Sequence, residues 1–162
     1  MKKQGFTLIE LMVVIVIMGI LAAVAVPKLF GMIAKSKASE VGPAAGEYVK
    51  LQSAYFAETT KLGGWTLIGY KAPGTATSAT NSKSNNFEYD GSAIDANTAV
   101  VTATTDSWKA KNNNKLNDCG SAFHWHIKSV WSDNNVTYEP TIDDETAGEC
   151  TALTASFTQI GG

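Results

Sequence analysis

The sequence has 162 residues, the length of one globular domain, which excludes a second independent catalytic domain. Its formal net charge of -2 comes from 15 acidic and 13 basic residues, and so weak a balance excludes a broad basic surface for nucleic acid. Every residue from Leu11 to Val26 is apolar or Gly, whereas the remainder is rich in Thr, Ser, Asn and Gly. We therefore expect an apolar segment joined to a polar head.

The chain starts with a short basic stretch, residues 1–5, followed by 21 residues from Phe6 to Val26 in which Glu10 is the only charge. As a helix, this segment is long enough to cross a bilayer core. A signal peptide cleaved after Ala23-Val24-Ala25 and an uncleaved anchor both fit the pattern. Glu10 argues against both, because a carboxylate within an apolar run costs about 2 to 3 kcal/mol at mid-bilayer.

The residues around Glu10 resemble the class III signal of type IV pilins and pseudopilins. The matching stretch is Lys3-Gln4-Gly5-Phe6-Thr7-Leu8-Ile9-Glu10-Leu11. The resemblance implies that a prepilin peptidase cleaves between Gly5 and Phe6 and methylates the Phe6 amine. It also implies that Glu10 neutralises the Phe6 amine of a neighbouring subunit during assembly. Such pairing is physically reasonable, since an α-amine is cationic at neutral pH and a charge in hydrocarbon needs a partner.

A second helical pattern follows Pro27, with an apolar stripe at spacings of three and four. The stripe consists of Val41, Ala45, Tyr48, Leu51 and Tyr55. A continuous helix from Phe6 to Lys61 would be roughly 84 Å long, far more than a bilayer or a small head requires. We therefore expect a protruding stem that ends near Lys61-Leu62-Gly63-Gly64, with a Gly just after its last turn.

Three residues of the stem match helix-weakening positions of the pilin family, namely Gly19, Pro27 and Pro43. Each Pro removes one helix hydrogen bond, so we expect the stem to bend there. The resemblance further implies that residues 19–27 unwind when the subunit leaves the membrane for a filament. A simple kink is the alternative for a plain membrane anchor.

The second half of the sequence predicts a sheet. Residues 63–86 are expected to form the loop between stem and sheet. Strands are expected at Asn86–Tyr89, Ala99–Thr104, Ala122–Trp131 and Val136–Glu139, with a turn at 133–135. One long helix followed by antiparallel strands indicates an α+β fold.

The sequence thus divides into four segments. They are a leader at 1–5, a transmembrane or filament-core helix at 6–27, an amphipathic half of the stem at 28–62, and a globular head at 63–162 with a sheet and a C-terminal loop.

The two cysteines, Cys119 and Cys150, both lie in the head and lack a metal-binding spacing. In an exported head they are expected to form a disulfide closing a loop of roughly 30 residues, which contributes about 3 to 4 kcal/mol in the chain-entropy model. Two buried free thiols are the alternative.

Candidate metal ligands occur at two places. The acidic run Asp143, Asp144, Glu145 with Glu149 offers carboxylates for calcium, and major pseudopilins use an acidic C-terminal loop in this way. A solvated acidic loop is the alternative, and no other cofactor is expected. His124 and His126 form an H-x-H pair on the third strand, for which surface or packing histidines are the simpler interpretation.

The four tryptophans are expected in the core, with a sugar-stacking platform as the alternative. They are Trp65, Trp108, Trp125 and Trp131. No P-loop, dinucleotide fingerprint, G-x-S-x-G or H-E-x-x-H motif occurs, so an enzyme is not expected.

The leading hypothesis is a major pilin, a helical homopolymer whose stems pack together and whose heads form the surface. Its expected partners are the prepilin peptidase, the pilus assembly machinery and, before assembly, the inner membrane; no nucleic-acid site is evident. The alternatives are a major pseudopilin of type II secretion and, in a different class, a membrane-anchored or secreted module for carbohydrate or metal. Major pseudopilins commonly lack the disulfide, so the cysteines favour an extracellular pilus over a periplasmic pseudopilus.

Overall fold

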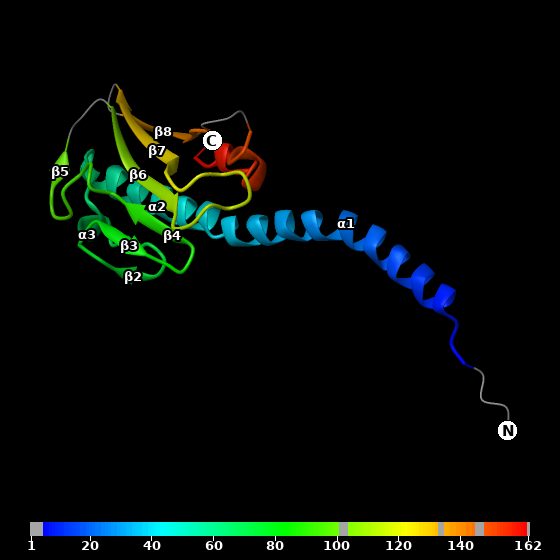
Figure 1. The fold of residues 1–162 in the computed structure, drawn as a ribbon. Helices are drawn as coiled ribbons and strands as arrows, with labels where there is room; N and C mark the ends of the chain where they lie inside the picture. The colour runs from blue at the N-terminus through cyan, green and yellow to red at the C-terminus, as the bar shows by residue number, and fades with distance from the viewer. Residues whose placement is uncertain (1–4, 101–103, 133–134, 145–147, 162) are drawn as a thin grey trace.

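The computed structural model describes residues 5–100, 104–132, 135–144 and 148–161. A long helical stem leaves a head of antiparallel strands, and the N-terminal end of the stem lies far from the head (Figure 1). The α+β arrangement is therefore confirmed. Of the expected leader at 1–5, only Gly5 lies within the described residues.

The stem consists of two helices, α1 at Leu8–Ala38 and α2 at Val41–Thr59. Helix α1 continues through Gly19 and Pro27, so neither residue interrupts it. The break falls at residues 39–40, directly before the first turn of α2, which contains Pro43. Pro43 has no N–H to offer the Ser39 carbonyl and its ring crowds that group, which explains the break. The expected single helix is thus two helices joined by a turn.

The end of the stem differs from the expected glycine cap. Helix α2 ends at Thr59, and Thr60 adopts the left-handed conformation with φ 54°. The expected stop at Lys61-Leu62-Gly63-Gly64 therefore lies too late in the sequence. Gly64 instead allows close approach of two backbone segments, because a Cβ there would lie 2.0 Å from the Asp95 carbonyl oxygen.

In its described residues, the head contains one large sheet, one small sheet and three short helices. The large sheet has the order β2-β3-β4-β6-β7-β8 and is antiparallel throughout. Its strands are Thr75–Ala76, Asn81–Lys83, Phe87–Asp90, Thr104–Asn112, Phe123–Ser132 and Asn135–Ile142. The small sheet pairs β1, Leu62–Gly63, with β5, Ala99–Val100. The short helices are α3 at Trp65–Ile68, η1 at Thr151–Leu153 and η2 at Phe157–Gln159.

Three of the four expected strands correspond to β4, β7 and β8. The expected strand Ala99–Thr104 is not one strand of one sheet, because Ala99–Val100 belongs to the small sheet and Thr104 begins β6 of the large sheet. Residues 101–103 of this prediction lie outside the described residues. Most of β6 was missed, and residues 63–86 hold α3, β2 and β3 rather than loop alone. In the expected turn at 133–135, positions 133 and 134 lie outside the described residues and Asn135 begins β8.

Helix α2 packs on the large sheet and forms the core with it. Tyr48 from the helix and Trp108 and Trp125 from the sheet are fully buried. Trp65 is 4% exposed, so the core interpretation is confirmed for three of the four tryptophans. Trp131 is partly buried and packs against a smaller apolar cluster. The Gln52 amide, oriented so that both its groups are satisfied, pairs with the N–H and C=O of Gly63 at 3.1 Å each and ties α2 to β1.

Candidate functional site

The exposed half of the stem is the largest apolar surface of the part of the chain that the structure describes. Among the residues that the structure describes, every exposed large hydrophobic side chain except Leu67 lies between Phe6 and Ile33. By length and composition the stem is able to cross a membrane, and its most apolar window is not buried within the chain. An apolar surface of this extent marks a contact with lipid or with other protein chains.

Glu10 lies at the free end of this surface and closes a capping box. Its carboxylate Oε2 accepts hydrogen bonds from the Thr7 backbone N–H at 2.8 Å and the Thr7 hydroxyl at 2.6 Å, while Thr7 Oγ1 accepts from the Glu10 N–H at 3.3 Å. Both bonds to the carboxylate end on Oε2, and none of the described residues donates to Oε1, which is therefore available to a donor from another chain. Thr7 was not identified from the sequence, although its T-x-x-E spacing is the usual capping-box signal.

Gly5 and Phe6 precede the helix in an exposed, non-helical segment. Phe6 is 78% exposed. A Cβ on Gly5 would meet no atom within 4 Å, so the fold of this chain does not itself require glycine at this position. An exposed and extended peptide bond is accessible to a peptidase.

Gly19 is similarly uncrowded. A Cβ at this position would meet no atom within 4 Å, so nothing in the single chain requires a glycine there. Residues 19–27 are helical in this structure. The expected unwinding of this stretch on assembly stays a prediction.

The disulfide between Cys119 and Cys150 is confirmed, with an S–S distance of 2.07 Å. It ties the C-terminal segment to the turn before β7. Both cysteines are almost fully buried. The alternative of two free thiols is therefore excluded.

Asp144 binds the backbone on both sides of Cys150. Its carboxylate accepts hydrogen bonds from the backbone N–H groups of Gly148, Cys150 and Thr151 and from the Thr151 hydroxyl. Burial alone would raise the pKa of the Asp144 carboxyl, but these hydrogen bonds together hold its pKa below the ordinary value.

The carboxylates expected for calcium do not share one set of contacts. The Asp144 oxygens are used by the hydrogen bonds just described, and Asp143 Oδ2 lies 3.4 Å from His126 Nε2. Glu149 is part of the segment that those bonds order, and Glu145 lies outside the described residues. Calcium binding stays a prediction.

The two histidines of β7 have different neighbours. His126 Nδ1 lies 3.2 Å from the Asp106 carboxylate. His124 instead lies beside the disulfide, between the carbonyls of Gly120 and Asp143. The H-x-H pair therefore does not converge on a common ion, and both histidines are buried.

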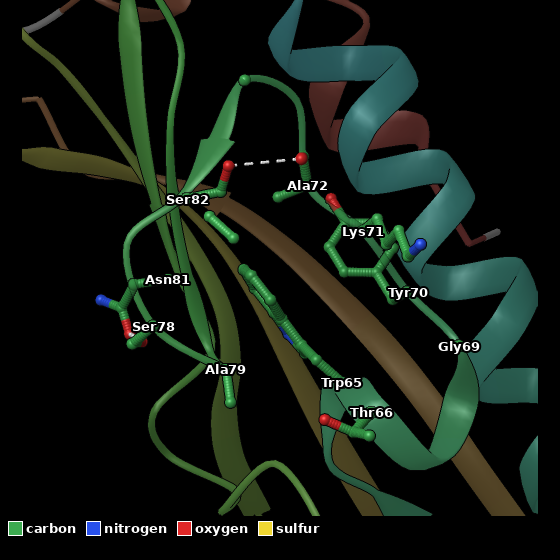
Figure 2. Close-up of a pocket in the computed structure, with 12 residues that line it drawn as sticks. Trp65, Thr66, Gly69, Tyr70, Lys71, Ala72, Ser78, Ala79, Asn81 and Ser82 are labelled. Atoms are coloured by element: carbon green, nitrogen blue, oxygen red, sulfur yellow. Dashed lines mark hydrogen bonds between the residues drawn. The ribbon is translucent and has the colours of Figure 1, made fainter.

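A hollow of about 440 Å³ lies between α3 and the β2–β3 hairpin (Figure 2). Trp65, Tyr70 and Ala72 line it, and Ser82 Oγ at its wall donates to the Ala72 carbonyl at 3.3 Å. Lys71 is the one charged residue of the lining. The lining thus lacks a pair of groups suited to acid–base or nucleophilic catalysis.

An exposed apolar stem with one carboxylate near its start, joined to a disulfide-bonded antiparallel head, defines the class of membrane-competent, pilin-like subunits. Residues 1–26 match the prokaryotic N-terminal methylation motif. The chain is 32% identical over 156 residues to the type IV major fimbrial protein FimA of Dichelobacter nodosus, an alignment that covers 86% of this chain and 93% of the relative. The chain belongs to the type IV pilin family.

Other relatives match over a shorter part of the chain. The type IV major pilin protein PilA of Myxococcus xanthus is 44% identical over 57 residues, which is 35% of this chain and 26% of that protein. Fimbrial protein Q of Moraxella bovis is 48% identical over 63 residues, or 38% of this chain and 40% of that protein. These alignments span less than half the length of either relative.

Proposed function

We propose that the chain is the major structural subunit of a type IV pilus, assembled through its stem after removal of the leader at 1–5. The observation that carries this proposal is the exposed apolar surface from Phe6 to Ile33 with Glu10 at its end. In the membrane this surface faces lipid, and in a filament the stems of neighbouring subunits cover one another.

The charge at the stem's end supports the same proposal. Cleavage after Gly5 creates an amine at Phe6, four residues from Glu10 in the same chain and within reach of Glu10 in a neighbour. Glu10 Oε1 is free of the capping bonds, so it accepts the neighbour's amine without loss of the helix cap. Pairing offsets the cost of both charges in an apolar environment.

The major pseudopilin is the less favoured alternative. The disulfide between Cys119 and Cys150 and the relatives named as major pilin or fimbrial proteins favour a pilus. A cleaved or anchored binding module is less favoured still, since α1 runs unbroken through Ala23-Val24-Ala25 and three of the four tryptophans are buried in the core. The proposed role is structural rather than catalytic.

The family also implies the partners and the location. We infer that a prepilin peptidase cleaves the Gly5–Phe6 bond and that the pilus assembly machinery acts on the subunit while it is held in the membrane. Further copies of this chain pack against the stem. The subunit resides in the inner membrane before assembly and in an extracellular filament afterwards.

Mass spectrometry of the mature N-terminus tests this processing. We expect a chain that begins with N-methylated Phe6. Replacing Gly5 with Val should block cleavage while leaving the fold unchanged, because the glycine has no neighbours to crowd. A mature chain that begins at Val26 would overturn the proposal.

A further inference from the structure

Cys119, Cys150 and His124 form a buried cluster that filament assembly leaves unused. Their ligand-capable atoms all lie within 4.8 Å of one another. The three side chains are 0%, 1% and 2% exposed, respectively. Within the described ranges, this is the one group of three side chains placed to hold a metal ion.

An irregularity in β7 gives His124 its position. Ala110 of β6 pairs with Trp125 and Lys111 pairs with Phe123, so His124 has no partner on β6. A bulge of this kind re-aims a side chain out of the regular alternation. His126, in contrast, stays paired opposite Lys109.

The ring of His124 has more acceptors around it than a neutral imidazole satisfies. Nδ1 faces the Asp143 carbonyl, and Nε2 lies 3.0 Å from the Gly120 carbonyl. A neutral ring has a single N–H, so it donates to only one of them. The Gly120 oxygen also lies 3.9 Å from Cys119 Sγ, which puts Nε2 on the side of the sulfurs.

A metal ion bound to Nε2 would remove the mismatch between two carbonyl acceptors and a single N–H. The lone pair of Nε2 would bind the ion, and Nδ1–H would keep its hydrogen bond to the Asp143 carbonyl. Metal-bound histidines commonly donate their second N–H to a carbonyl in this way, which fixes the ring for the ion.

We propose that the dithiol form of this chain binds one thiophilic divalent ion of the Zn²⁺ class through Cys119 Sγ, Cys150 Sγ and His124 Nε2. Two thiolates and one imidazole make a three-ligand site with a fourth position for water. The newly exported chain carries both thiols until a disulfide-bearing thiol oxidant takes up their two electrons and two protons by thiol–disulfide exchange and is itself reduced to a dithiol. Metal binding releases the two thiol protons and forms two metal–sulfur bonds without any redox change. The ion thus holds the two cysteines together before oxidation.

Cobalt titration of the full chain in detergent micelles tests the site. A phosphine reduces the disulfide, which gains two electrons and two protons while the phosphine takes up the oxygen of water. We expect the reduced chain to bind one equivalent of Co²⁺ with sulfur-to-cobalt charge transfer and tetrahedral d–d absorption. The oxidised chain should show neither signal, because its sulfurs are joined to each other.

His124→Gln and His126→Gln form a matched pair of variants on the same strand. We expect His124→Gln to weaken cobalt binding at least about tenfold, whereas His126→Gln leaves it unchanged. Equal binding by His124→Gln and the unmodified chain, or no cobalt binding by the reduced chain, would overturn the proposal. Nitrogen-15 NMR of the reduced, unmodified chain tests it without a variant: Zn²⁺ should shift the His124 Nε2 resonance, and an unmoved resonance would also overturn it.

Discussion

At the scale of single residues, Glu10 has two roles that the structure separates. Within one chain its Oε2 caps α1 through Thr7. Between chains its remaining oxygen and its charge are available to the Phe6 amine of a neighbour. The cost of a carboxylate in an apolar segment is therefore offset partly by a local cap and partly, in our proposal, by assembly.

Replacing Glu10 with Ala should abolish filaments while leaving membrane insertion intact. An unpaired Phe6 amine in the apolar core of a filament costs about 3 to 5 kcal/mol, which corresponds to at least a hundredfold loss of assembly. The measurement is the yield of sheared surface filaments against the amount of subunit in the membrane.

Thr7→Ala is the control for Glu10, because it removes the cap but keeps the charge. We expect a loss of about 1 kcal/mol in helix stability and filaments that still form. If Thr7→Ala and Glu10→Ala lost filaments equally, the cap rather than the charge would explain the requirement for Glu10.

A second prediction for a single residue concerns how Asp144 affects stability at different pH values. Because the folded state lowers the pKa of its carboxyl, the carboxylate contributes stability above the unfolded pKa, near 4, and that contribution is lost as the pH falls through the folded pKa. Asp144→Asn should lower the free energy of unfolding at pH 7 by on the order of 1 kcal/mol, discounted for exposure. The difference should shrink as the pH falls below about 4 and disappear once the Asp144 carboxyl is protonated in the folded state.

Thermal unfolding across pH measures this effect, with Asp143→Asn as the control. The Asp143 side chain is 73% exposed, so its replacement should change stability little at pH 7. A deficit for Asp144→Asn that stayed constant down to pH 2 would show that the charge is not responsible.

At the scale of elements, the turn between α1 and α2 fixes how the head joins the stem. Tyr89 donates a hydrogen bond of 2.6 Å to the Glu40 carboxylate, which holds the turn against β4. Burial raises the pKa of Tyr89, so the hydroxyl remains a donor at all physiological pH values. The turn at residues 39–40 is thus held against the large sheet.

Pro43→Ala should join α1 and α2 into one helix, because residue 43 regains an N–H for the Ser39 carbonyl. We expect amide hydrogen exchange at residues 39–44 to slow about tenfold, equivalent to about 1.4 kcal/mol. Pro27→Ala is the control, since α1 is already continuous there. If amide exchange at residues 39–44 were as fast in Pro43→Ala as in the unmodified chain, Pro43 would not be the cause of the break between α1 and α2.

Gln52 provides a further prediction at this scale. Gln52→Leu leaves the buried backbone groups of Gly63 without partners and should cost about 2 to 3 kcal/mol in the free energy of unfolding. Denaturant unfolding in detergent measures this cost, and Lys50→Leu on the exposed side of α2 is the control. Equal midpoints for the two variants would contradict the proposed link between α2 and β1.

The strands show what the sequence could predict and what it could not. β7 was found because Trp125 and Ile127 alternate with polar residues. β6 was missed because Lys109 and Lys111 give its sequence a charged character that does not predict a strand packed on the core. In the structure these lysines form ion pairs with Asp90 and Glu88 of the neighbouring strand β4. Such pairing depends on register between distant segments, which local pattern does not contain.

A bulge limited the prediction for β7 as well. Regular alternation along the strand would place Phe123 on the same face as Trp125, but the irregularity at His124 places Phe123 between Lys109 and Lys111, each with its amine 5.1 Å from the ring centroid. The candidate site in the stem was predictable, because the N-terminal motif is contiguous in sequence. The contacts of the C-terminal loop were not, because they join residues brought together only by folding.

At the scale of the whole molecule, the chain divides its surface between two environments. The head buries most of its aromatic residues and exposes polar groups, whereas the stem from Phe6 to Ile33 exposes almost only apolar side chains. Figure 1 shows this part of the stem extending away from the head with nothing from the chain to cover it. Lipid before assembly and neighbouring stems afterwards are the two partners that suit such a surface.

Helical reconstruction of filaments by electron cryomicroscopy is the decisive test of assembly through the stem. We predict a core made of packed stems, with the amine of Phe6 from one subunit within ion-pair distance of Glu10 in its neighbour and the heads on the outside. Filaments of this chain whose stems lie apart from one another, or whose Glu10 faces no amine, would contradict this mode of assembly.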